Sequence, residues 1–134
     1  MADLVQVSAN VRSVSGRILT GTAGVAISAG NMIYQSTADS EFYLAGNGTA
    51  VKAAVAGIAI ANADLNGIVS YQVDGVVDPG ATATEGETYV ASDTDGNIAP
   101  VGDLATGDFV TWYGVGNSDG NIELNLQASG IAKP

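Results

Sequence analysis

The chain has 134 residues, the size of a single domain, and its 14 acidic and 4 basic residues give a net charge of −10. It contains no cysteine and no histidine, which excludes disulfide scaffolds, thiol catalysis, zinc knuckles, serine–histidine triads and histidine-ligated metal sites. The scarcity of basic residues also argues against a nucleic-acid surface, because phosphate neutralisation needs clustered Lys and Arg.

Neither the longest apolar stretch nor the N-terminal residues indicate a membrane or exported protein. The longest stretch without charged or strongly polar residues, 53–61, is far shorter than the roughly 20 residues of a membrane-spanning helix. The start Met1-Ala2-Asp3-Leu4 lacks the basic beginning and apolar run of a signal peptide. We therefore expect a soluble protein, made in the cytoplasm, with neither membrane nor nucleic acid as a partner.

Residues 1–20 are expected to form an N-terminal arm or an added strand. Half of the basic residues of the chain, Arg12 and Arg17, lie in this stretch. The guanidinium group of Arg suits bidentate pairing with carboxylates on a partner protein. The alternative is that both are ordinary solvated arginines.

Residues 21–134 are expected to form one β domain. Pairs of turn-forming residues occur along the whole stretch at roughly the 8 to 12 residue spacing of a sandwich or barrel. They contain Gly30, Gly48, Gly67, Gly75, Gly80, Gly86, Gly96, Gly107, Gly120 and Gly130. The high glycine content and the few helix formers exclude long helices.

Between the turns, apolar residues alternate with polar or small ones, which predicts strands. The pattern covers 53–63, 68–74 and 121–127. In 68–74 it sets Val69, Tyr71 and Val73 on one face and Ser70, Gln72 and Asp74 on the other. Residues 109–115 are apolar on both faces, which predicts a central strand and sends the adjacent Trp112 and Tyr113 to opposite faces.

An internal repeat relates residues 23–75 to residues 79–130. Four positions of the first copy match the second at one offset of 56, as the pairs Gly24/Gly80, Gly30/Gly86, Ser36/Ser92 and Asp39/Asp95 show. Two hairpin-rich halves of this kind are expected to close on one core. The predicted fold is all-β, a compact barrel or sandwich that is jelly-roll-like or β-tulip-like, with the N-terminal arm added.

Several acidic segments have the composition of metal-binding or catalytic sites but not the residue spacing that such sites need. Residues 93–97 and 117–123 resemble calcium loops, yet the glycine that such a loop needs at its sixth position is replaced by Ile98 or Ile122. Glu85 and Glu87 flank a turn glycine, where solvated carboxylates are the simpler interpretation than glycosidase chemistry. No catalytic residue, metal or cofactor is therefore expected, and the protein is not expected to be an enzyme.

The ordered series of strand and turn signals from residue 21 to residue 132 resembles small capsid decoration (cement) proteins of tailed bacteriophages. The likeness is carried by 24–30 with Ile33-Tyr34, Gly57-Ile58-Ala59, 69–75, 80–92 with Gly86-Glu87-Thr88-Tyr89-Val90, Ile98-Ala99-Pro100-Val101, Gly107-Asp108-Phe109-Val110 and Ala128-Ser129-Gly130-Ile131-Ala132. The block around Asp39, Gly57 and 70–75 is also similar to the head-stabilising proteins that form trimeric knobs on phage heads.

The resemblance implies a structural virion protein on the outer surface of a phage capsid, made in the host bacterial cytoplasm. Its partner would be an HK97-type major capsid protein, whose neighbouring subunits it cements against the pressure of packaged DNA. It would also associate with itself, as a trimer first and a dimer second. The residues expected to contact the capsid are Leu4, Val5, Val7, Arg12, Arg17 and Trp112.

Two other functions remain open from the residues. One is a carbohydrate- or ligand-binding β module of a fibre or tail, which needs an exposed aromatic platform that Trp112 or the tyrosines would supply. Tyr34 and Tyr89 occupy repeat positions that match within one residue, which favours a structural use for them. The other is a component of the tail or neck.

Overall fold

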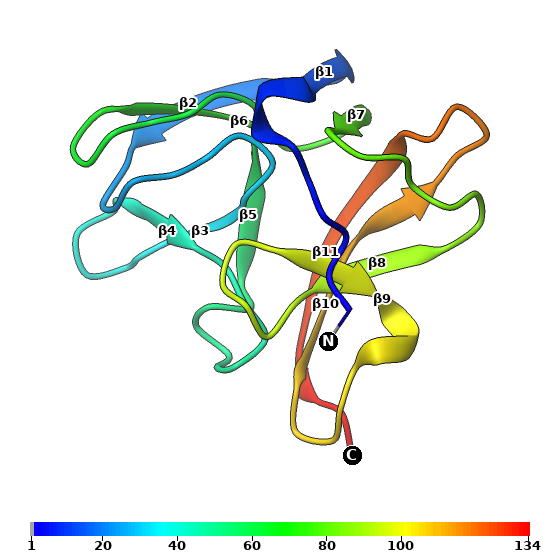
Figure 1. Ribbon diagram of the computed structural model, residues 1–134. Coiled ribbons are helices and arrows are strands. Elements are labelled where there is room, and N and C mark those ends of the chain that lie inside the picture. The colour runs from blue at the N-terminus through cyan, green and yellow to red at the C-terminus, as the bar shows by residue number, and fades with distance from the viewer. Residues whose placement is uncertain (1) are drawn as a thin grey trace.

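The computed structural model describes residues 2–134, and these residues form two antiparallel β-sheets without an α-helix (Figure 1). The strands are β1 Val11–Ser15, β2 Ile18–Thr22, β3 Met32–Gln35, β4 Phe42–Leu44, β5 Val55–Ala59, β6 Ile68–Gln72, β7 Val76–Pro79, β8 Thr88–Ala91, β9 Ile98–Pro100, β10 Phe109–Gly116 and β11 Ile122–Ala132. Two short 3₁₀ turns, η1 Ser8–Asn10 and η2 Val101–Asp103, complete the regular structure. The all-β prediction is confirmed.

The two sheets have the same strand order. The five-stranded sheet runs β2-β6-β5-β3-β4, and the six-stranded sheet repeats this order as β7-β11-β10-β8-β9 with β1 added beside β7. β3 begins at Met32 and β8 at Thr88, whereas β4 begins at Phe42 and β9 at Ile98, so both pairs of strands are 56 residues apart. The structure thus has two similar, hairpin-rich halves.

The sheets remain open. Each one ends in two edge strands that do not pair with the other sheet, so the arrangement is compatible with a sandwich and the closed barrel is wrong. β10 lies between β8 and β11, as expected for a central strand. Eight of the ten turn glycines have positive φ angles. These are Gly30, Gly75, Gly80, Gly86, Gly96, Gly107, Gly120 and Gly130.

The main core lies between the sheets. It combines Met32 and Ile58 of the five-stranded sheet with Tyr89, Tyr113 and other buried residues of the six-stranded sheet. A second cluster, which includes Phe42, covers the opposite face of the five-stranded sheet. The five-stranded sheet is therefore buried on both faces over much of its area, which explains why residues 55–59 are almost entirely small or apolar.

One long antiparallel ribbon connects the sheets. Residues 11–22 run against residues 68–79, first as β1 with β7 in the six-stranded sheet and then as β2 with β6 in the five-stranded sheet. The register shifts between Ser13 and Ser15, where the ribbon passes from one sheet to the other. Residues 1–20 were expected to form an arm or added strand, and the described part of this segment supplies β1 and the start of β2.

The Gln72 side chain holds this crossing together. Its amide nitrogen lies 2.7 Å from the main-chain oxygens of Ser15 and Asp74 and 3.0 Å from that of Val76, so its two hydrogens are shared among three acceptors. Gln72 is fully buried, and its Oε1 atom has no partner in residues 2–134. The alternation in 68–74 placed Gln72 on the polar face, so its burial is a departure from the sequence pattern.

Two glycines allow the crossing segments to touch. Gly16 has a φ of 132°, and a Cβ atom on it would lie 2.1 Å from the Asp74 carbonyl oxygen. Gly75 has a φ of 81°, and a Cβ atom there would lie 2.1 Å from the Ser15 carbonyl oxygen. Both positions exclude any other residue without a shift of the main chain.

The crossing predicts that Gln72→Leu lowers the free energy of unfolding by about 2 kcal/mol, because three inward carbonyl oxygens lose their donor. Gln72→Glu is expected to cost more at neutral pH, since it turns a charged carboxylate toward the same oxygens. Urea unfolding measures both effects. Gln127→Leu, on an exposed position of β11, is the matched control and is expected to change stability by less than about 0.5 kcal/mol. A Gln72→Leu protein as stable as the parent would contradict this account.

Candidate interaction surface

The six residues expected to contact a partner lie in three parts of the structure. Leu4, Val5 and Val7 belong to the segment before η1, Arg12 and Arg17 lie on the ribbon, and Trp112 lies on β10. The structure brings together the first three and Arg12, as described below. Arg17 binds Asp74 of its own chain, and Trp112 lines neither of the hollows near these residues.

The segment before η1 is bound along its length to the six-stranded sheet. The Asp3 carboxylate accepts hydrogen bonds from the side chains of Ser92 and Asn97, the latter at 2.9 Å. The Leu4 N–H donates to the Ile98 oxygen of β9 at 2.9 Å. Farther along, the Val7 N–H donates to the Gly80 oxygen, also at 2.9 Å. The segment therefore runs from edge strand β9 toward β7 as a fixed part of the domain.

Extended backbone points successive side chains in opposite directions. Leu4 is partly buried and packs against the main core. Val5 and Val7 point outward, with 81% and 50% of their surfaces exposed. We call these two side chains the N-terminal ridge. Because the main chain beneath them is hydrogen-bonded in place, covering the ridge would order little additional backbone.

Two polar hollows lie near the N-terminal ridge: Val5 lines the first, and the Val7 N–H is bonded to Gly80, which lines the second. One, of about 330 Å³, is lined by Asp3, Leu4, Val5, Gln6, Ser8, Ser28, Ala29, Asn31 and Asn97. The other, of about 370 Å³, is lined by Asn10, Arg12, Asp78, Gly80, Ala81, Thr82, Asp119, Gly120 and Asn121. Arg12 is exposed beside two carboxylates in the second hollow. The ridge and its surroundings thus present apolar, acidic and basic groups within one area.

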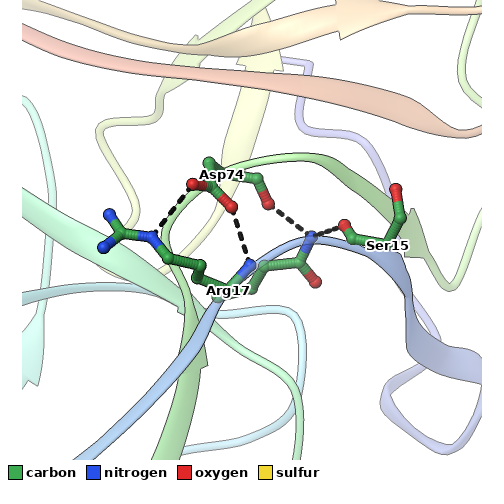
Figure 2. A network of polar contacts seen from close by, with 4 residues as sticks. Ser15, Arg17 and Asp74 are labelled. Carbon is green, nitrogen blue, oxygen red and sulfur yellow. Dashed lines mark hydrogen bonds and ion pairs between the residues drawn. The ribbon is translucent and has the colours of Figure 1, made fainter.

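Arg17 is engaged within the chain (Figure 2). Its main-chain N–H donates to Asp74 Oδ1 at 2.7 Å, and its Nε donates to Asp74 Oδ2 at 3.1 Å. The Arg17 main-chain N–H and guanidinium hold the pKa of the Asp74 carboxyl below its ordinary value of 3.8. Arg17 therefore supports the crossing of the two sheets.

Trp112 is half-buried and lies on the face of the six-stranded sheet opposite Tyr113. Tyr113 is fully buried in the main core, as expected for at least one residue of the pair. Its hydroxyl has no partner in residues 2–134, and burial raises its pKa. Trp112 does not lie among the residues that line the hollows beside the N-terminal ridge.

A third hollow, of about 240 Å³, contains an aromatic pair that the sequence did not identify as a site. It is lined by Val25, Tyr34, Tyr43, Leu44, Lys52 and Asp95. The rings of Tyr34 and Tyr43 have centroids 6.0 Å apart and planes tilted by 33°. Tyr43 donates its hydroxyl to Asp39 at 2.6 Å, which raises the pKa of Tyr43 to about 12. We call this site the tyrosine hollow.

An ion pair closes one side of the tyrosine hollow. Lys52 Nζ lies 2.7 Å from Asp95 Oδ2, and this contact raises the pKa of Lys52. The match of Tyr34 with Tyr89 in the repeat suggested one structural use for both residues. Tyr89 is buried in the main core, and Tyr34 packs against the same core while it also lines the hollow. The tyrosine hollow could be located only from the cross-strand pairing of Tyr34 with Tyr43 in the β3–β4 hairpin.

Residues 2–134 contain no group of three or more acidic side chains placed to hold a metal ion. None of the helices in the same residues is long and apolar enough to cross a membrane. Comparison of the chain with protein-family models, with curated proteins and with solved structures finds no match.

The contact between Arg17 and Asp74 predicts a pH dependence of stability. A carboxyl with a lowered pKa in the folded state stabilises that state above its unfolded value of 3.8. This contribution is lost as the pH falls through the lower, folded value. We expect Asp74→Asn to be less stable than the parent at pH 7 and the difference to shrink steadily on acidification.

Urea unfolding at several pH values measures this difference. Asp64→Asn, on an exposed turn after β5, is the control and is expected to follow the parent at each pH. A constant gap between Asp74→Asn and the parent from pH 7 to strongly acidic pH would show that the carboxylate charge does not stabilise the crossing.

Proposed function

We propose that this chain is a structural virion protein that binds the outer surface of an HK97-type phage capsid and cements neighbouring capsid subunits. The observation that carries the proposal is the N-terminal ridge, two exposed valines on a segment fixed to the domain by hydrogen bonds. The likeness of the chain to capsid decoration proteins supplies the identity of the partner. The two-sheet body agrees with the all-β domain that this likeness implies.

The size of the ridge favours attachment at several points. Covering the exposed parts of Val5 and Val7 contributes roughly 3 kcal/mol. Association of two proteins costs about 4 to 15 kcal/mol in lost translational and rotational freedom, so the ridge alone would not give a stable one-to-one complex. A repeating capsid lattice presents many equivalent sites, and an oligomer that engages several of them gains strongly in avidity.

The charge of the chain agrees with a position outside the capsid. A net charge of −10 keeps the free protein soluble and repels it from packaged DNA. Arg12, which lines the hollow that contains Gly80, is one of only four basic residues in the chain. It is placed to pair with a carboxylate of the major capsid protein. The protein would be made in the host bacterial cytoplasm and added to the outer surface of the shell.

We expect a double substitution of the ridge, Val5→Asp with Val7→Asp, to weaken capsid binding at least about tenfold. It places two charges against the surface that the valines would cover, and it leaves the core unchanged. The measurement is co-sedimentation of the purified protein with expanded capsids of the encoding phage that lack it. Val51→Asp is the matched control, because Val51 is 66% exposed and lies outside the ridge and the hollows beside it.

The outcomes distinguish capsid binding itself from the use of the N-terminal ridge as the attachment surface. Binding of the parent and of the control, with loss in the ridge variant, is the expected result. Equal binding of all three proteins would place the attachment surface elsewhere. A parent that does not bind expanded capsids would contradict the capsid function itself.

A carbohydrate- or ligand-binding module is the second candidate, and the tyrosine hollow is the observation that favours it. Its two ring faces offer apolar contact to a sugar ring, and Lys52 and Asp95 offer a donor and an acceptor for hydroxyl groups. About 240 Å³ is close to the lower end of the usual size of ligand sites. This function would make the protein a fibre or tail component.

A glycan array probed with the labelled protein distinguishes the two candidates. The capsid function predicts no saccharide binding above background. Specific binding that is lost in Tyr34→Ala and retained in Trp112→Ala would favour the ligand-binding module and assign it to the tyrosine hollow. Binding lost only in Trp112→Ala would assign it to the outer face of the six-stranded sheet.

A further inference from the structure

The chain contains two Asn-Gly pairs, Asn47-Gly48 and Asn66-Gly67. In such a pair the main-chain nitrogen of the glycine can attack the side-chain amide carbon of the asparagine. Glycine favours this reaction because it has no Cβ atom to hinder rotation of the main chain into the reactive conformation. The two pairs have the same chemistry, so a difference in their reactivity in the folded protein must come from the structure around them.

The fold holds Asn47 in place. This residue is 1% exposed, and its Nδ2 atom donates to the Ala91 oxygen of β8 at 3.2 Å. Its main-chain N–H donates to the Ser92 oxygen at 3.1 Å, and its main-chain oxygen accepts from the Phe109 N–H of β10 at 2.9 Å. Asn47 can therefore reach the reactive conformation only when its contacts with the six-stranded sheet open.

Asn66, in contrast, lies in the exposed turn between β5 and β6. Asp64, Leu65 and Asn66 are all exposed, with Leu65 at 60%. Within residues 2–134, no hydrogen bond involves the Asn66 side chain. The φ angle of Asn66 is 67°, in the left-handed region that asparagine tolerates better than most residues. The side-chain amide carbon is therefore accessible, and no polar contact holds it away from the main chain.

The attacking nitrogen of Gly67 is held only at the end of a strand pair. Its N–H donates to the Asp64 oxygen at 2.8 Å and closes the turn. The Gly67 oxygen accepts from the Ala23 N–H at 2.9 Å, directly beyond the last paired residues of β2 and β6, Thr22 and Ile68. Strand ends and exposed turns open locally at a much lower cost in free energy than the centre of a sheet. Each opening frees the Gly67 nitrogen beside the Asn66 side chain.

We propose that Asn66 is a site of spontaneous deamidation in the folded protein, whereas Asn47 is protected. The Gly67 main-chain nitrogen attacks Cγ of Asn66 and loses its proton, and the side-chain nitrogen leaves as ammonia. Water then opens the resulting succinimide ring at either of its two carbonyl carbons. One opening gives aspartate. The other gives isoaspartate, in which the main chain continues through the side-chain carbon.

Conversion to isoaspartate loosens the contact between this turn and the segment after β2. The Asn66 N–H donates to the Ala23 oxygen at 2.8 Å, and the Ala23 N–H donates to the Gly67 oxygen at 2.9 Å. Isoaspartate adds one main-chain carbon between these two anchor points, so both hydrogen bonds cannot keep their geometry. Ala23 is fully buried in the second cluster beside Phe42, and the modification therefore weakens the attachment of a core residue.

Peptide mapping by mass spectrometry tests the proposed site. The purified parent is incubated at mildly alkaline pH in two samples, one folded and one unfolded in urea. In the folded sample, Asn66 is expected to convert from amide to acid at least about tenfold faster than Asn47, because its turn opens more often. In the unfolded sample the two residues are expected to convert at similar rates, because the fold no longer protects Asn47.

Asn66→Gly is the matched variant, because it removes the reactive amide and tolerates the positive φ. Its folded sample is expected to show no conversion at this turn. A folded parent in which Asn66 and Asn47 convert at the same rate would overturn the proposal. A folded parent in which Asn66 stays unmodified while the unfolded sample reacts would also overturn it.

Amide hydrogen exchange tests the structural consequence. The isoaspartate form, separated from the aged sample by ion exchange, is expected to exchange the Ala23 amide at least about tenfold faster than the fresh parent. Asn66→Asp is the matched control, since it adds the same charge without lengthening the main chain, and it is expected to exchange Ala23 like the parent. Parent-like protection of Ala23 in the isoaspartate form, or equal loss in Asn66→Asp, would contradict the effect assigned to the longer main chain. Failure of capsid binding in the experiment above would leave these results unaffected.

Discussion

The fully buried amide of Gln72 lies at the point where the ribbon passes from one sheet to the other, and the path of the chain on both sides depends on it. It donates to main-chain oxygens of both strands of the ribbon at the point where the ribbon leaves one sheet and enters the other. At the same crossing, the Asp74 carboxylate accepts hydrogen bonds from the main-chain N–H and the Nε of Arg17. Gly16 and Gly75 permit the two main chains to approach closely there.

The surfaces proposed for function follow from this crossing. Upstream of it, β1 aligns with β7 and the preceding segment extends toward β9, which fixes the N-terminal ridge over the six-stranded sheet. Downstream of it, β2 aligns with β6 and becomes the outermost strand of the five-stranded sheet. A single bend in the ribbon thus places the N-terminal segment on one sheet and β2 on the other.

Local sequence patterns were sufficient to predict the strands and much of their arrangement. Alternation predicted the strands at 68–74 and 121–127, and the apolar character of 109–115 predicted a central strand. The offset of 56 anticipated two halves, which the structure shows as two sheets of the same order. Alternation could not predict the burial of Gln72, because its cause is a bend that brings residues 15 and 72 together.

The candidate surfaces were less accessible to sequence reasoning. Leu4, Val5 and Val7 were identified together, but only the hydrogen bonds of the segment determine that Leu4 faces the core and the valines face outward. Arg17 was expected to contact a partner and is bound to Asp74 of its own chain.

The central claim is that the chain belongs to the capsid surface in many copies. Quantitative mass spectrometry of purified virions, which measures the copy number of this chain relative to the major capsid protein, tests it most directly. The account predicts a ratio near one or a simple fraction of one, as lattice binding requires. A ratio far below one would place the protein in the tail or neck, and its absence from virions would contradict the capsid function.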